Sequence, residues 1–289
     1  MGGFLRRHKG AIPYLLLAPG LLWLTVFFVV PGFQMFMTSL WSGTLETGYE
    51  FALSNVSNYT AALTRFWPQF SRSILYGGAA TLLTFAISYP LAYTIAFRGG
   101  RYKNLLLFLV IAPFFTSFLL RTISWKIILG DTGILLGPLK GAGILPDEFR
   151  VLATPIAVIF GITYNFLPFM TLPIYVSLEK IDRRLVEAAE DLYASTLGAF
   201  RRITFPLSLP GVFAGSLLTF IPAMGDYINA ELLGNPETTM IGNVIQNQFL
   251  TQNNYPTASA LSFILMAGIL VAVGVYARLL GTDELAGGA

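Results

Sequence analysis

Long apolar stretches separated by short polar segments dominate the chain. Six of them approach the roughly 20 residues that a helix needs to cross the hydrocarbon core of a bilayer. They cover residues 13–30, 74–97, 105–129, 153–176, 203–225 and 258–280. The pattern predicts an all-α integral membrane protein with six transmembrane helices.

Composition supports lipid as the main solvent. Of the 289 residues, 55% are hydrophobic and 11% are charged, whereas a soluble domain carries about 25% charged residues. The first stretch follows a basic head, as in a signal peptide. It is longer than a typical signal core, however, and no small-x-small cleavage site follows it. We therefore expect it to remain as a transmembrane helix.

The distribution of basic residues predicts the orientation. With the N-terminus in the cytoplasm, 12 Lys and Arg residues fall in the inside segments. Only 3 fall in the outside loops, namely Arg65, Lys140 and Arg150. Because basic residues concentrate on the cytoplasmic side, both termini are expected in the cytoplasm. No internal repeat is visible, which disfavours an inverted-repeat secondary transporter.

Several kinds of chemistry are absent from the chain. It has no cysteine, and its one histidine, His8, lies in the polar N-terminal tail. No thiolate or clustered metal site and no nucleophile–His–acid set is expected, so we predict no catalytic and no metal-binding residues. The chain has no Gly-Lys pair and therefore lacks the phosphate-binding loop of an ATPase. An ion-coupled secondary transporter and a membrane-embedded enzyme remain as alternatives of other classes.

The loop between the fourth and fifth stretches, at about 179–206, has helical periodicity. Asp182 stands where it can cap a helix, and Arg183 precedes Glu187 by four residues. An apolar stripe consists of Leu185, Ala188, Ala189 and Leu192. We expect a short amphipathic helix outside the membrane. It could lie on lipid, but a stripe of mostly alanine without an aromatic anchor favours docking against another protein.

Two prolines follow this loop. Pro206 and Pro210 begin the fifth stretch, and proline disfavours an uninterrupted helix. We expect a rigid, broken connection here, which would transmit movement of the short helix into the fifth span.

Residues 187–211 carry a family resemblance. Glu-Ala-Ala at 187–189, with Asp-Leu, Ala-Ser and Pro-Leu-x-x-Pro-Gly after it, resembles the EAA loop of permease subunits in bacterial ABC importers of the type I, MetI-like fold. In that family the loop docks in a cleft of the ATPase subunit. The resemblance implies these ATPase-coupling residues: Glu187, Ala188, Ala189, Asp191, Leu192, Ala194 and Ser195. Tyr193 replaces the glycine of the family motif, and the nearby Gly198 is a candidate to compensate.

Segments 13–31 and 225–250 narrow the resemblance to the first permease subunit of spermidine/putrescine importers. It implies a second, different permease, two ATPase copies that bind ATP and Mg, and an extracytoplasmic binding protein. It also implies the bacterial inner membrane and no cofactor in this chain. Residues 1–289 would form a single permease domain. Relatives that carry opines or ferric iron share much of the pattern, so these substrates stay open.

The segment after the fifth stretch is acidic. Residues 226–256 contain three carboxylates and no Lys or Arg. At about 1.5 Å per residue, Asp226 lies roughly 22 Å beyond Gly211. A carboxylate that faces lipid at such a depth costs about 2.5–3.5 kcal/mol, so it should face protein or water.

Two interpretations of Asp226 stay open. It lines a substrate path and contacts a cation, with Tyr227, Glu231 and Phe220 as further candidates. Alternatively, it caps the following segment or pairs with Arg121 or Lys126.

Overall fold

The structure is a computed structural model that describes residues 12–44 and 46–280. The N-terminal residues counted in the orientation argument (Arg6, Arg7 and Lys9) lie outside the described residues, as does His8. The chain divides into two compact units. The first contains residues up to 65 together with 247–264, and the second contains 66–246 together with the residues from 265 onward.

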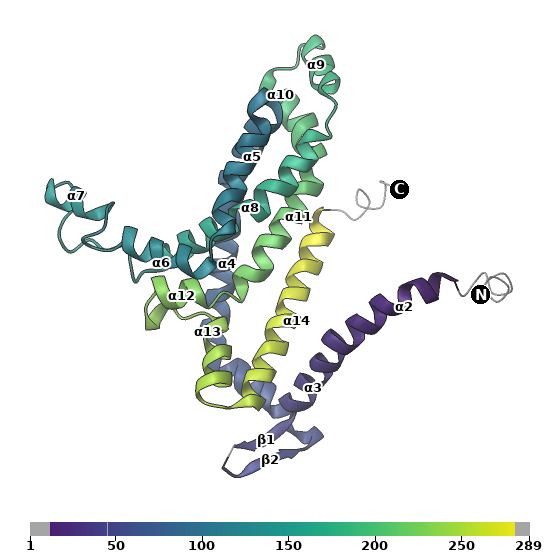
Figure 1. Cartoon of the computed structure of the whole chain (residues 1–289), viewed down its shortest axis with the longest axis vertical. Coiled ribbons are helices and arrows are strands. Elements are labelled where there is room, and N and C mark those ends of the chain that lie inside the picture. The colour runs from purple at the N-terminus through teal and green to yellow at the C-terminus, as the bar shows by residue number, and fades with distance from the viewer. Residues whose placement is uncertain (1–11, 45, 281–289) are drawn as a thin grey trace. The chain divides into compact units, whose positions relative to one another are not determined.

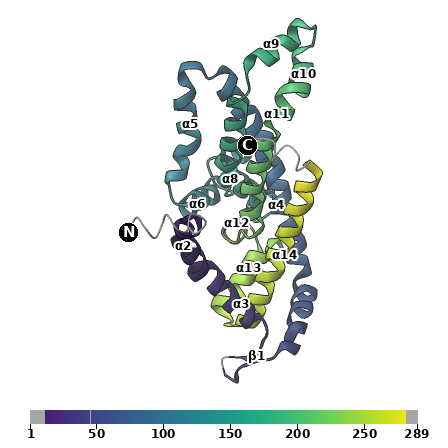
Figure 2. The same ribbon diagram turned by 90° about the vertical axis from the view of Figure 1, so that its right-hand side faces the viewer.

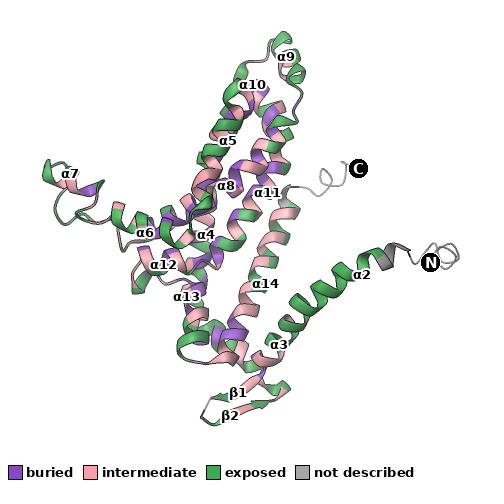
Figure 3. Ribbon diagram, in the orientation of Figure 1, coloured by how far each residue is buried: buried purple, intermediate pink, exposed green. Residues whose placement is uncertain are grey.

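The first unit begins with an unbroken helical run. It consists of α2 (Ile12–Leu24), the π-helical turn η1 (Thr25–Val29) and α3 (Val30–Ser39). The predicted first span, 13–30, therefore lies within this helical run, but the run continues to Ser39, nine residues beyond the predicted end. Every residue of 16–31 is exposed, as the green ribbon of Figure 3 shows. A helix that is apolar on all sides is typical of a membrane span.

A two-stranded hairpin follows α3 and is the one departure from an all-helical chain among the described residues. Strands β1 (Trp41–Thr44) and β2 (Gly48–Phe51) pair antiparallel, with Trp41 opposite Phe51. The short turn η2 (Leu53–Val56) leads into α4 (Ser57–Arg98). The side-chain amide of Asn58 donates to the carbonyls of Ser39 and Trp41, both at 2.9 Å, and fixes the hairpin to the helix start.

The second unit consists mainly of helices (Figure 1). In chain order after α4 the elements are η3 (Gly100–Tyr102), α5 (Lys103–Ile111), η4 (Ala112–Phe115), α6 (Phe118–Ile128), α7 (Leu136–Gly141), α8 (Pro155–Glu179), α9 (Arg183–Asp191), α10 (Thr196–Ala199), η5 (Phe200–Thr204), α11 (Phe205–Met224), α12 (Ile228–Leu233), η6 (Pro236–Thr238), α13 (Ile241–Gln246), η7 (Asn247–Thr251) and α14 (Tyr255–Leu280). Of these, η7 and the start of α14 belong to the first unit.

Helices α8 and α11 pack against each other over an extended contact, and buried residues concentrate along them (Figure 3). Gly211 and Gly215 allow the close approach. A Cβ atom on Gly211 would lie 2.4 Å from the carbonyl oxygen of Pro173, and one on Gly215 would lie 2.9 Å from the sulfur of Met170. Small residues at helix contacts are how membrane helices bring their backbones together.

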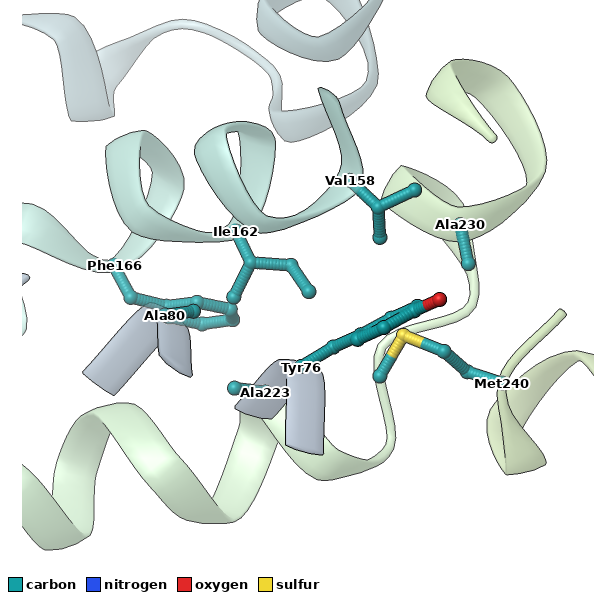
Figure 4. Packing of buried hydrophobic residues seen from close by; sticks show 8 residues of the cluster. All are labelled: Tyr76, Ala80, Val158, Ile162, Phe166, Ala223, Ala230 and Met240. Atoms are coloured by element: carbon teal, nitrogen blue, oxygen red, sulfur yellow. The ribbon is translucent and has the colours of Figure 1, made fainter. Parts of the chain in front are cut away.

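One hydrophobic cluster ties α4, α8 and α11 to the segments that follow α11 (Figure 4). The ring of Tyr76 lies between the side chains of Ile162 and Met240 in the close-up, with Ala223 beneath it. The full cluster is Tyr76, Ala80, Val158, Ile162, Phe166, Ala223, Ala230 and Met240.

The predicted third span, 105–129, is present as two helical segments with a sharp bend between them. Segments Gly100–Phe115 and Phe118–Ile128 meet at an angle of 93°. Pro113 and the extended backbone at Thr116 (φ −89°, ψ 153°) end the first segment.

The predicted break at Pro206 and Pro210 is wrong. The chain is helical from Thr196 to Met224, through α10, the π-helical turn η5 and α11. Pro206 occupies the first turn of α11, where proline is tolerated, and the wider π turn precedes it. Pro210 lies inside α11, as membrane helices allow when neighbouring helices satisfy the backbone.

In the part of the chain that the structure describes, five helices are long and apolar enough to cross a membrane. The number rises to six if the bent α5–α6 pair is one span. The predicted bundle of six helices is confirmed at this level, and the bend is the main departure from it.

Candidate functional site

The short helix predicted outside the span region is present as α9, at one end of the second unit in both views (Figure 1, Figure 2). Asp182 caps it, because its carboxylate accepts the backbone N–H of Arg184 at 3.0 Å. Arg183 does not pair with Glu187. Its guanidinium donates to the carbonyls of Ala96 and Phe97, at 3.1 and 3.3 Å, and so anchors α9 to the last turn of α4.

Tyr193 makes the turn that glycine makes in the family motif. Its φ of 62° lies in the left-handed region, which glycine adopts at no steric cost. Gly198 does not compensate, because it lies inside α10 and donates its N–H to the Ser195 hydroxyl, which caps that helix at 3.2 Å. The backbone here keeps a glycine-type conformation although the residue is tyrosine.

The loop presents apolar side chains to its surroundings. Leu192 is 81% exposed and Tyr193 is 99% exposed, and Leu185 and Leu197 are also exposed. Glu187 and Ala188 are exposed, Ala189 is half-buried, and no ion pair of Glu187 is present in the described residues. The remaining predicted coupling residues lie in the same loop, with Asp191 and Ser195 exposed and Ala194 half-buried.

Aromatic packing connects this loop to the span helices. Phe200 of η5 contacts Tyr89 of α4 edge-on, with ring centroids 5.8 Å apart, and Phe205 contacts the same ring at 5.7 Å. The Tyr89 hydroxyl lies 2.8 Å from the hydroxyl of Ser208 in α11. These contacts connect η5, which directly follows α10, to α4 and α11.

Asp226 lies in a buried polar network. It is 7% exposed, and its carboxylate accepts the backbone N–H and the side-chain amide of Asn229, at 2.9 and 2.6 Å. This contact caps the first turn of α12. Asp226 follows the span that ends at Met224, and burial raises the pKa of its carboxyl group, an effect that the hydrogen bonds from Asn229 partly offset.

The network continues across three helices. The side-chain oxygen of Asn229 accepts from the Thr122 hydroxyl of α6 at 3.3 Å and from the Asn165 amide of α8 at 3.1 Å. The capping contact proposed for Asp226 is present, whereas no ion pair joins it to Arg121 or Lys126 in the described residues. Sequence reasoning missed Thr122, Asn165 and Asn229, although Asn165 is conspicuous as an amide inside an apolar stretch.

The other candidate path residues do not join Asp226 in one site. Tyr227 and Glu231 are exposed beside it. Phe220 instead lines an apolar cavity of about 290 Å³ together with Thr81, Ser216 and Tyr276. Within the described residues, no group of three or more His, Cys, Asp or Glu side chains is arranged to hold a metal ion.

Comparison with known proteins decides the family. Residues 87–280 match the family described as "binding-protein-dependent transport system inner membrane component". The chain belongs to this family. The membership that the EAA-type loop predicted is thereby confirmed.

Curated members of this family align with most of the chain. The spermidine/putrescine transport system permease protein PotB of Haemophilus influenzae is 40% identical and covers 89% of this chain and 90% of its own length. The protein of the same name from Escherichia coli is 37% identical, with 89% and 93% covered.

Solved structures share the fold. A chain of a bacterial ABC transporter involved in the import of the acidic polysaccharide alginate superimposes with a TM-score of 0.74 at 20% identity, covering 96% of both chains. The methionine ABC transporter MetNI gives a TM-score of 0.54 at 18% identity, covering 77% of this chain and 97% of that chain. The fold of ABC importer permeases is therefore present here.

Proposed function

We propose that this chain is a permease subunit of an ATP-driven importer of polyamines such as spermidine and putrescine. The single observation that carries the proposal is the 40% identity to a spermidine/putrescine permease over nearly its whole length. The acidic segment 226–256 supports a cationic substrate, because its carboxylates attract positive charge.

The subunit acts with other chains. A second, different permease completes the pore, two ATPase copies bind ATP and Mg, and an extracytoplasmic binding protein delivers the substrate. The chain itself catalyses no reaction and carries no cofactor. A related structure of the alginate transporter contains a substrate-bound periplasmic protein, which supports this kind of assembly.

Residues 1–289 act as one transmembrane domain of the bacterial inner membrane, with both termini in the cytoplasm. The family model covers residues 87–280, and curated permease relatives align with 89% of the chain, which supports treating it as one functional domain. The coupling loop at about 179–206 then faces the cytoplasm, where the ATPase is.

The loop docks on the ATPase through its exposed side chains. Leu192 and Tyr193 supply apolar contact area, and Glu187 supplies an unpaired carboxylate for a basic residue of the ATPase. Ala188 and Ala189 have small side chains, so that α9 can fit into a cleft of the ATPase. Asp191, Ala194 and Ser195 lie at the turn that leads from α9 into α10. Movement of the loop reaches α4 and α11 through the rings of Phe200 and Phe205.

At the outer end, Asp226 takes part in the substrate path through its network with Asn229, and Tyr227, Glu231 and Phe220 contribute further along it. Asp226→Asn tests this role, with uptake measured beside the yield of assembled complex. Lower uptake at normal yield supports it. Unchanged uptake, or loss only through failed assembly, leaves Asp226 as a structural cap.

Purification of the tagged complex tests the whole proposal. It should bring down an ATPase, and ATP hydrolysis in proteoliposomes with the binding protein should rise with spermidine or putrescine but not with an opine or ferric iron. Ala188→Trp should release or uncouple the ATPase, whereas Glu190→Trp, on the opposite side of α9, should not. If no ATPase co-purifies, or if Ala188→Trp transports normally, the proposal is wrong.

A further inference from the structure

Arg121 is a buried cation that forms no ion pair within the described residues. It lies in α6, just after the right-angle bend, and is 8% exposed. Its guanidinium carbon lies 4.9 Å from the ring centre of Phe114 and 5.7 Å from that of Phe118. Its buried Nε atom has no hydrogen-bond partner in the structure as described.

No carboxylate in the described residues neutralises this charge. The ion pairs present there join Lys103 to Glu179 and Asp131 to Lys140 and Arg150. Asp226 instead accepts hydrogen bonds from Asn229. Removing a charged group from water costs several kcal/mol unless an opposite charge and hydrogen bonds compensate. The position of Arg121 therefore calls for an anion from outside the chain.

An apolar cavity adjoins the guanidinium. It has a volume of about 290 Å³, and Arg121 supplies its charged wall. The remaining wall is formed by α4, α5, η4 and α8, through Leu91, Leu106, Leu109, Val110, Pro113, Tyr164, Leu167 and Pro168. Since these segments belong to the candidate membrane spans, the cavity suits a hydrocarbon chain more than a water-soluble anion.

The surroundings of Arg121 are those of a membrane–water boundary. Trp125, one turn further along α6, packs edge-on against Tyr164 of α8, with centroids 5.3 Å apart. Tryptophan and tyrosine concentrate at the level of lipid headgroups. The 93° bend also means that α6 runs along the bilayer surface if α5 crosses the bilayer. The guanidinium and the aromatic pair thus lie beside the same apolar cavity, because Arg121 and Tyr164 both line it.

We propose that Arg121 binds the phosphate of an anionic membrane phospholipid, whose acyl chain fills the cavity between α4, α5 and α8. The guanidinium donates to the phosphate oxygens in its forked geometry. The bound lipid neutralises the buried charge and holds the bend between α5 and α6. The proposal concerns a lipid site and does not depend on the transported substrate.

Native mass spectrometry of the purified chain, titrated with phosphatidylglycerol or phosphatidylcholine, tests the proposal. Phosphatidylglycerol should bind roughly fivefold tighter or better, the factor expected for one basic residue at an anionic headgroup. Arg121→Gln should abolish the preference. Lys126→Gln, which removes a charge from an exposed residue of the same helix, should leave it unchanged.

Two further variants separate the headgroup from the acyl chain. Arg121→Lys keeps the charge and should retain a preference, even if Arg121→Gln fails to fold. Val110→Trp fills the cavity and should weaken binding of both lipids with Arg121 intact.

Three results would overturn the proposal. The first is equal binding of both lipids to the unaltered chain. The second is displacement of the lipid preference by millimolar inorganic phosphate, which indicates a site for a free anion. The third is loss of a co-purified second permease in Arg121→Gln with lipid binding unchanged, which indicates that a carboxylate of the partner neutralises Arg121.

Discussion

Gly211→Ala should destabilise the protein through the contact between α8 and α11. The added Cβ would lie 2.4 Å from the backbone oxygen of Pro173, and 2.5 Å from the hydroxyl oxygen of Ser177. Ordinary contacts lie near 3.5 Å, so the helices must separate locally by about 1 Å. The Ser177 hydroxyl can rotate away, but the Pro173 oxygen belongs to the helix backbone and cannot.

Two opposing effects of Gly211→Ala determine the change in the free energy of unfolding: overpacking and helix propensity. Overpacking of a close contact costs about 1–3 kcal/mol. Replacing glycine by alanine inside a helix gains about 1 kcal/mol in exposed positions. Gly268→Ala in α14 is the matched control, because its added Cβ meets no atom within 4 Å. Both variants share the helix-propensity gain, so the difference between them isolates the overpacking of α8 against α11.

Thermal unfolding of the purified chain in detergent, followed by circular dichroism, measures this difference. On the scale of soluble domains, 1–3 kcal/mol corresponds to roughly 2–12 °C, with Gly211→Ala melting below Gly268→Ala. Equal melting temperatures for the two variants would refute the close approach at Gly211.

Other changes probe the polar network and the coupling loop. Asn229→Ala removes the side-chain amide that donates to the buried Asp226 carboxylate, while the backbone N–H at position 229 still donates to it. The loss of this buried hydrogen bond should lower the free energy of unfolding by about 1–3 kcal/mol, and thermal unfolding should show no such loss for the exposed Glu231→Gln. Tyr193→Ile should destabilise the turn between α9 and α10 by about 1–2 kcal/mol, because a β-branched residue disfavours a φ of 62°. Tyr193→Gly should leave the turn as stable as before. Hydrogen exchange of the backbone amides in this turn distinguishes the two outcomes. Ser195→Ala should remove the N-terminal cap of α10 and destabilise that helix by about 1 kcal/mol. Hydrogen exchange of the Gly198 amide should then become faster. An unchanged exchange rate would contradict the cap.

The locations of the spans and the character of the coupling loop follow from the sequence. A bilayer selects for length and apolarity, which are local properties, so the runs around Ala80, Ile162 and Leu217 could be assigned without knowing their neighbours. The α9 helix was predictable for the same reason, since a cap at Asp182 and a 3.6-residue period are contained in one short segment.

Features that depend on several segments required the tertiary structure. Pro113 is compatible with a kink but does not predict the 93° turn that follows it, and Pro206 does not predict the π turn that continues the helix. Proline limits the backbone, but whether a helix kinks, breaks or continues depends on the neighbours that satisfy its free carbonyls.

The surroundings of the polar residues were likewise decided by packing. Asp226 meets Asn229 three residues later, but that amide is held by Thr122 and Asn165, which come from helices 107 and 64 residues away from Asn229. Arg121 was a candidate ion-pair partner of Asp226, yet it is buried beside Phe114 and an apolar cavity. The sequence determines which segments enter the membrane, because the free energy of transfer into lipid depends on the side chains of each segment alone. The fold determines which polar groups meet there, because that depends on which helices pack together.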